Sequence, residues 1–156
     1  MSRSGPSTRL QQSLGYLLRR AQHAFRTRID DSLRPLGLTA PQYAAMAAVE
    51  ADEGISNAEL ARAAFVTAQS MQGILANLER KRLLTRNAHP GHGRIRCSEL
   101  TARGRAILAQ ARLRVQKIEQ LLAEAVGPDL RAQFEALLSR CANTLDGAAL
   151  SSARSR

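Results

Sequence analysis

Two helix-start signatures separated by a tight connection restrict this chain to few folds. Ser56-Asn-Ala-Glu59 has the capping-box pattern, in which the serine and glutamate side chains each bond a free backbone N–H at a helix N-terminus. Thr67 can cap a longer helix that begins at Ala68, which leaves Phe65-Val66 as the connection between the two helices. A short helix, a tight turn and a longer helix in this order predict a helix-turn-helix.

Directly after the second helix, the sequence changes to a pattern typical of a β-hairpin. Residues 84–88 and 95–100 both allow alternation of inward and outward side chains, and the turn-rich His89-Pro-Gly-His-Gly93 lies between them. A hairpin at this place makes the helix-turn-helix winged. Such a unit places its second helix in the major groove of DNA, with the N-terminal residues of that helix over base edges.

A long amphipathic segment precedes this unit. Apolar residues recur every three or four positions from Leu10 to Leu36, which predicts one long helix ended by Pro35 and Gly37. Thr39-Ala-Pro-Gln42 is a further capping box, with proline in the first turn, and begins the next helix.

Two more helices are expected after the hairpin. Thr101 caps the first, which should end near Val126, and the second carries apolar residues from Leu130 to Leu145. Residues 147–156 are expected to form a disordered tail. The fold class is therefore mainly α with a small β-wing, a winged helix-turn-helix flanked by N- and C-terminal dimerisation helices.

The apolar stripes of the flanking helices predict a homodimer, because one monomer of this size has too little surface to cover three such stripes. We divide the chain accordingly. Residues 1–36 form an N-terminal dimerisation helix, residues 37–103 a winged helix-turn-helix DNA-binding domain, and residues 104–156 the C-terminal dimerisation helices and tail.

Charge favours a nucleic-acid partner. The 23 Lys and Arg residues exceed the 13 Asp and Glu residues and give a formal net charge of +10 at pH 7. A balance this basic indicates binding to nucleic acid or to an anionic membrane surface. Residues 56–105 carry nine of the basic residues against three acids, so the excess concentrates on the predicted DNA-binding unit. An Arg-rich surface that serves only solubility is the alternative.

The predicted recognition helix has one face suited to reading DNA. If Met71, Ile74, Leu75 and Leu78 form the buried stripe, polar residues occupy the opposite face. Glutamine and asparagine can pair with adenine, and arginine can reach guanine or phosphate. Gly73 is unfavourable in a helix interior and is explained either by close approach to the DNA backbone or by tight core packing. The predicted DNA-binding residues are Thr67, Gln69, Ser70, Gln72, Gly73, Asn77 and Arg80, together with Arg94 and Arg96 on the wing.

At the level of motifs the chain resembles the MarR family of bacterial regulators, over roughly residues 10–146. The resemblance rests on Leu38-Thr-Ala-Pro-Gln-Tyr43, Asn57-Ala-Glu-Leu-Ala61, Leu78-Glu-Arg-Lys-Arg-Leu83, and Arg94 through Leu100-Thr101-Ala-Arg-Gly104. It implies a winged-helix dimer paired through its terminal helices. It also implies that a small molecule or an oxidant controls DNA binding.

The wing departs from the family pattern. Family members usually read Asp-Pro-x-Asp-Arg-Arg there, whereas this chain has His89-Pro90-Gly91-His92-Gly93-Arg94. Arg94 remains the candidate to enter the minor groove of DNA. The acidic residue that would hold its side chain in place is missing here. The two histidines and Cys97 also have donor types that zinc accepts, but a fourth ligand is not evident, so we expect no metal site and no cofactor.

The resemblance also implies an effector site. Family members bind aromatic acids and phenols in the groove between the dimer helices and the winged domain. A pocket with apolar walls, a cation and a histidine suits such ligands. The residues of this chain that match are Arg20, His23, Tyr43 and Met46.

The sequence thus predicts a dimeric repressor that a small aromatic or phenolic effector releases from a pseudo-palindromic operator. It is expected to be cytoplasmic, because no apolar run is long enough to span a membrane and no secretory signal is visible. No catalytic constellation is present, so an enzyme is not expected. The alternatives are a non-specific architectural DNA-binding protein and a redox-responsive regulator that uses Cys97. Cys141 is expected to be a buried core thiol.

Overall fold

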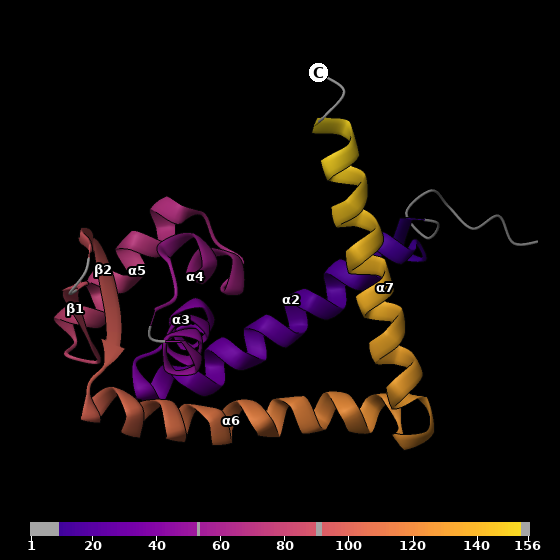
Figure 1. Cartoon of the computed structure of the whole chain (residues 1–156). Helices are drawn as coiled ribbons and strands as arrows, with labels where there is room; N and C mark the ends of the chain where they lie inside the picture. Colours follow the sequence, from indigo (N-terminus) through magenta and orange to yellow (C-terminus); the bar gives the residue numbers. More distant parts are fainter. Residues whose placement is uncertain (1–9, 53, 90–91, 154–156) are drawn as a thin grey trace, which may run out of the picture. The chain divides into compact units, whose positions relative to one another are not determined.

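The computed structural model describes residues 10–52, 54–89 and 92–153 (Figure 1). Most of these residues are helical, and two strands form one antiparallel sheet, which confirms the predicted fold class. The elements are α2 (Leu14–Leu33), η1 (Arg34–Leu36), α3 (Ala40–Ala51), α4 (Asn57–Ala63), α5 (Ala68–Arg80), β1 (Leu84–His89), β2 (His92–Leu100), α6 (Ala102–Val126) and α7 (Pro128–Ala153).

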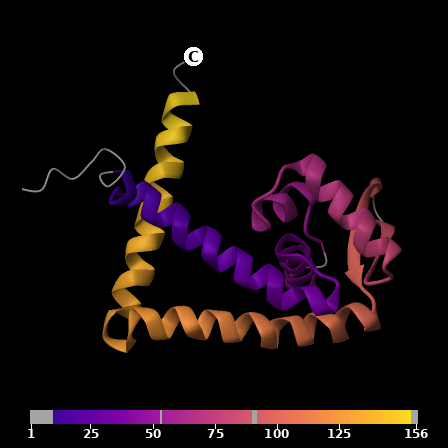
Figure 2. The ribbon, with the colours of Figure 1, turned by 180° about the vertical axis from the view of Figure 1, so that it is seen from behind.

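The chain separates into two compact units, of which the first ends at Ile118 and the second begins at Glu119. The boundary lies inside α6, so this helix contributes to both units. In the first unit, the two strands lie at the edge of a cluster of α3, α4 and α5 (Figures 1 and 2). The functional division at residues 36 and 103 remains a prediction.

Local capping explains where three of the helices begin. The Oγ1 atom of Thr39 accepts a hydrogen bond from the Gln42 amide, and the Gln42 Oε1 atom accepts one from the Thr39 amide at 3.1 Å. Ser56 and Glu59 form the same reciprocal pair, which lowers the pKa of the Glu59 carboxyl because the hydrogen bonds favour its charged form. Thr67 caps α5. These three predicted caps are confirmed, as is that of Thr101, whose Oγ1 atom accepts a hydrogen bond from the Gly104 amide.

The ends of the chain differ from the prediction. The helix expected from Leu10 is interrupted because the Ser13 Oγ atom accepts a hydrogen bond from the Tyr16 amide, so α2 begins at Leu14. At the other end α7 continues to Ala153, so the expectation of disorder was wrong for residues 147–153. The residues beyond Gly147 are mostly alanine, serine and leucine, which a helix can accommodate.

The core joins α2, α3, α4, α5 and the first half of α6. Its largest fully buried side chains come from all five helices and from the first strand, and they are Leu33, Met46, Val49, Leu60, Met71, Leu75, Leu78, Leu84 and Leu108. The predicted inward stripe of α5 is confirmed for Met71, Leu75 and Leu78, whereas Ile74 is only half-buried.

Hydrogen bonds join the start of α3 to the helices on either side. The Asp30 Oδ1 atom, near the end of α2, accepts a hydrogen bond from the Ala40 amide at 2.7 Å. The Nζ atom of Lys81, just after α5, donates to the Gly37 carbonyl oxygen at 2.6 Å. The first residue of α3 is therefore held to the end of α2, and the turn that leads into α3 is held to the residue that follows α5.

A glycine sets the distance between the base of the wing and α6. The Thr101 Oγ1 atom donates to the Arg82 carbonyl oxygen at 2.8 Å and accepts from the Gly104 amide at 2.9 Å. A Cβ atom at Gly104 would lie only 1.9 Å from the carbonyl oxygen of Leu83. The Leu-Thr-Ala-Arg-Gly run thus combines a helix cap with a contact that only glycine permits.

The predicted hairpin is confirmed. The two strands pair from Leu84 with Leu100 to Ala88 with Arg96, and the register shifts before His89 pairs with His92. The second strand begins at His92, earlier than the expected residue 95. Residues 90–91 and the side chains of residues 87–97 are outside the described part of the chain. The predictions for the side chains of His89, His92, Arg94, Arg96 and Cys97 therefore remain untested.

Candidate nucleic-acid interface

The turn between α4 and α5 presents the start of α5 to solvent. The Val66 amide donates to the Ala61 carbonyl oxygen at 2.9 Å, which closes the turn with Phe65 at a φ of 52°. The Thr67 Oγ1 atom accepts from the Ser70 amide at 3.1 Å and caps the helix. Thr67, Gln69 and Ser70 are all exposed, so polar side chains and the positive end of the helix dipole meet at this end of α5.

The outward face of α5 continues the exposed set. Gln72, Gly73 and Arg80 are exposed, as the helical wheel predicts. A Cβ atom at Gly73 would meet nothing within 4 Å. Tight core packing therefore does not explain this glycine, and close approach to a DNA backbone remains a prediction.

Asn77 differs from the other predicted DNA-binding residues on α5. It is half-buried, and its Oδ1 atom accepts a hydrogen bond from the Gln42 Nε2 atom at 2.9 Å. Gln42 is itself only 8% exposed and uses its other side-chain atom in the α3 cap. Because the Asn77 oxygen is already engaged inside the protein, we assign Asn77 to positioning α5 against α3.

A second polar contact fixes the two helices of the motif. The Nδ2 atom of Asn57, the first residue of α4, donates to the Ala68 carbonyl oxygen in the first turn of α5 at 3.5 Å. Sequence reasoning missed Asn57 and Gln42. Gln42 was visible only as a cap, and no local pattern reports a hydrogen bond between side chains on different helices.

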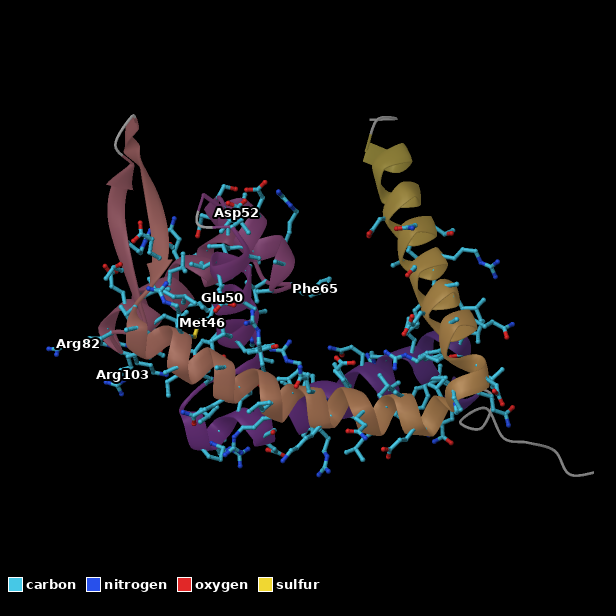
Figure 3. The ribbon with its side chains drawn as sticks, turned by 60° about the horizontal axis from the view of Figure 1, so that its bottom comes forward. Met46, Glu50, Asp52, Phe65, Arg82 and Arg103 are labelled. Atoms are coloured by element: carbon cyan, nitrogen blue, oxygen red, sulfur yellow. The ribbon has the colours of Figure 1, made fainter. Side chains whose placement is uncertain are left out.

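Basic residues lie where α5 ends and α6 begins. Arg80, Arg82 and Arg103 are exposed, and Figure 3 shows Arg82 and Arg103 extending outward from this end of the unit. Among the described residues none of the three is in an ion pair. Their charges are therefore available to an anionic partner.

The predicted effector residues divide into two sets. Arg20 and His23 line a pocket on α2 together with Tyr16, Arg19 and Gln22. Met46 is 0% exposed in the core, and Tyr43 is half-buried against it. The structure therefore groups Arg20 with His23 and places Tyr43 and Met46 outside this pocket, because α3 packs them into the unit.

The second unit exposes an apolar face. On α7 the exposed large apolar side chains are Leu130, Phe134, Leu137, Leu138 and Leu145. Cys141 lies on the same helix and its free thiol is exposed, so the prediction of a buried thiol was wrong. The apolar spacing of α7 was correctly identified, and its described side chains from Leu130 to Asp146 are all exposed.

Among the described residues, no three His, Cys, Asp or Glu side chains are grouped to hold a metal ion. The side chains of His89, His92 and Cys97 lie outside the described residues. None of the described helices is long and apolar enough to cross a membrane.

Comparisons with known proteins agree with this architecture. The MarR family model matches residues 36–95. The HTH-type transcriptional repressor Rv2887 of Mycobacterium tuberculosis is 38% identical over 128 residues, which span 81% of this chain and 91% of the relative.

Two solved structures are also similar. One is Rv2887 in complex with salicylic acid, at 34% identity and a TM-score of 0.68, covering 83% of this chain and 96% of that chain. The other is the transcriptional repressor CouR bound to a 23-mer DNA duplex, at 28% identity and a TM-score of 0.80, covering 90% and 99%.

Proposed function

Because the chain belongs to the MarR family of transcriptional regulators, we propose that it is a repressor that a small aromatic or phenolic effector releases from a pseudo-palindromic operator. The observation that carries the proposal is the exposed, capped start of α5, the helix that the wing follows in the chain. Thr67, Gln69 and Ser70 are presented there on a helix whose opposite face is buried. Action on chromosomal DNA places the protein in the cytoplasm.

The proposed operator follows from dimer geometry. The exposed apolar face of α7 supports pairing with a second copy. A two-fold axis then relates two copies of α5, which occupy successive major grooves about 34–36 Å apart. Arg94 and Arg96 on the wing are proposed to contact the flanking DNA, with Arg94 in the minor groove.

Replacing Gln69 or Gln72 by alanine should weaken binding to the operator and relax base preference. A lost bidentate pair lowers discrimination by about 1–3 kcal/mol, or roughly 5- to 150-fold. Arg80→Ala should instead weaken binding to all DNA sequences similarly, because a contact with phosphate does not depend on the base. Operator variants titrated against each protein provide the measurement. Gln110→Ala, an exposed glutamine on α6, is the matched control. Unchanged affinity and base preference in both glutamine variants would refute the assignment.

The effector site is proposed on α2. Arg19 and Arg20 supply positive charge, His23 a hydrogen-bonding ring and Tyr16 an aromatic wall. This donor set suits an aromatic carboxylate, and the relative Rv2887 is described in complex with salicylic acid. An effector releases DNA only by its differential affinity for the free and DNA-bound states.

Salicylate titrated into the protein–operator complex should release the DNA. His23→Ala should weaken the response to salicylate roughly 10-fold or more, since a hydrogen bond to a charged group is lost, while operator affinity without salicylate is retained. Arg28→Ala, an exposed residue of α2 outside the pocket, is the control. An equal response of the His23 and Arg28 variants would place the site elsewhere.

Salt dependence separates a repressor from an architectural protein. A non-specific binder should show a steep salt slope and similar affinity for all duplexes. A repressor should retain a preference of about 10³-fold or more for its operator. The redox alternative through Cys97 predicts that peroxide changes operator affinity and that Cys97→Ser abolishes the change.

A further inference from the structure

Phe65 occupies a backbone conformation that bulky residues avoid. It lies in the turn between α4 and α5 with a φ of 52°, in the left-handed region where glycine is favoured. The turn itself accounts for this φ, because the Phe65 amide donates to the Arg62 carbonyl oxygen and the Val66 amide to that of Ala61. Glycine would form both hydrogen bonds without the steric conflict at Cβ.

The phenyl ring of Phe65 contributes little to the stability of the fold. The side chain is 93% exposed, and Figure 3 shows it extending outward from the turn. Arg82 is the other non-glycine residue with positive φ among the described residues, but its charged side chain is well suited to water. Phe65 therefore combines a strained backbone with an unburied aromatic ring, and such strain typically accompanies functional sites.

The position of Phe65 indicates which partner would cover the ring. It lies two residues before Thr67, the cap of α5, and next to the exposed polar set that includes Gln69 and Ser70. When the start of α5 enters a major groove, the turn that precedes α5 lies at the edge of that groove. The apolar group that DNA presents there is the C5-methyl group of thymine, which phenylalanine can contact.

We propose that Phe65 contacts a thymine methyl group in each operator half-site and thereby selects thymine at that position. This inference rests on the proposed function, because it requires α5 to read DNA. It adds an apolar contact to an interface that otherwise consists of polar and cationic side chains. A second copy of the chain and an unrelated protein are the competing occupants, and the experiment below separates them from DNA.

The test replaces thymine by deoxyuridine, which removes only the methyl group. An operator selected with the unmodified protein is scanned at each thymine. Burial of one methyl group changes affinity about 4-fold. One thymine in each half-site should be sensitive, and replacing both should weaken operator binding by the dimer roughly 15-fold. Phe65→Ala should weaken binding to the thymine operator by at least this factor and should no longer distinguish deoxyuridine from thymine at that position.

Phe65→Gly separates this effect from stability. Glycine relieves the strain at positive φ, so the melting temperature should rise or stay unchanged while operator affinity falls as for the alanine variant. A structural role for the ring predicts the opposite, with stability lost and the response to deoxyuridine retained.

Three outcomes would overturn the proposal. The Phe65→Ala variant could bind the thymine operator like the unmodified protein. Its affinity could fall by the same factor for the thymine and the deoxyuridine operators, so that it would still distinguish them as the unmodified protein does. It could instead change the sedimentation of the free protein, which would assign the ring to a contact between copies. If Gln69→Ala and Gln72→Ala also leave binding unchanged, the proposed function fails as well; if they weaken it, only the role of Phe65 is rejected.

Discussion

Replacing Gly104 by alanine is expected to destabilise the protein by about 3 kcal/mol or more, at or above the upper end of the usual range for overpacking. The added Cβ atom would lie 1.9 Å from the carbonyl oxygen of Leu83, which is backbone and cannot rotate away. Relief therefore requires α6 to move from the base of the wing. That movement would break the hydrogen bonds of Thr101 to Arg82 and Gly104. Urea denaturation followed by circular dichroism measures the change.

Gly73→Ala is the matched control for this experiment. It makes the same substitution inside a helix, but its Cβ atom would meet nothing within 4 Å. Alanine should therefore stabilise α5 by up to about 1 kcal/mol through helix propensity. Equal stabilities of the two variants would contradict the assignment of Gly104 to close packing.

Introducing charge on the apolar face of α7 is expected to abolish the dimer and with it operator binding. Phe134→Glu combined with Leu138→Glu places two carboxylates where the proposed subunit contact is apolar. Sedimentation should then give about 17.0 kDa instead of twice that mass. Operator affinity should fall by about 100-fold or more, since the two half-sites are no longer bound by linked copies.

The control for α7 carries the same charge on the other face. Ser139→Glu with Asn143→Glu adds two carboxylates to the polar side of the helix and should leave both mass and affinity unchanged. If the Phe134 and Leu138 variant still sediments as a dimer, the subunit contact lies outside α7.

Local sequence predicted the helix starts well because a capping box is complete within four residues. Thr39 with Gln42 and Ser56 with Glu59 form their pairs as expected. The same local reasoning overlooked Ser13, whose cap is supported by no acidic partner in the first turn. Apolar spacing could not show that the large apolar side chains of α7 are exposed, since spacing identifies a face and not what packs on it.

The candidate site was predictable only where exposure follows from helical spacing. Gln69, Gln72 and Arg80 face outward because the opposite side of α5 is buried. Spacing could not separate Asn77 from them, since a hydrogen bond to Gln42 on another helix decides its orientation. On α3, Met46 is fully buried because that helix is covered on several sides, which a single sequence does not reveal.

The start of α3 links the helix that carries the proposed effector pocket to the helix that is proposed to read DNA. Asp30 holds it to α2 and Gln42 holds it to α5, while Lys81, just after α5, bonds Gly37 in the turn that leads into α3. A displacement of the end of α2 should therefore turn α5 as one block and leave its base-reading face intact. Under the proposed function, an effector would change the positions of the two copies of α5 on the duplex and leave each copy folded, so that a released protein would keep its sequence preference and rebind without refolding.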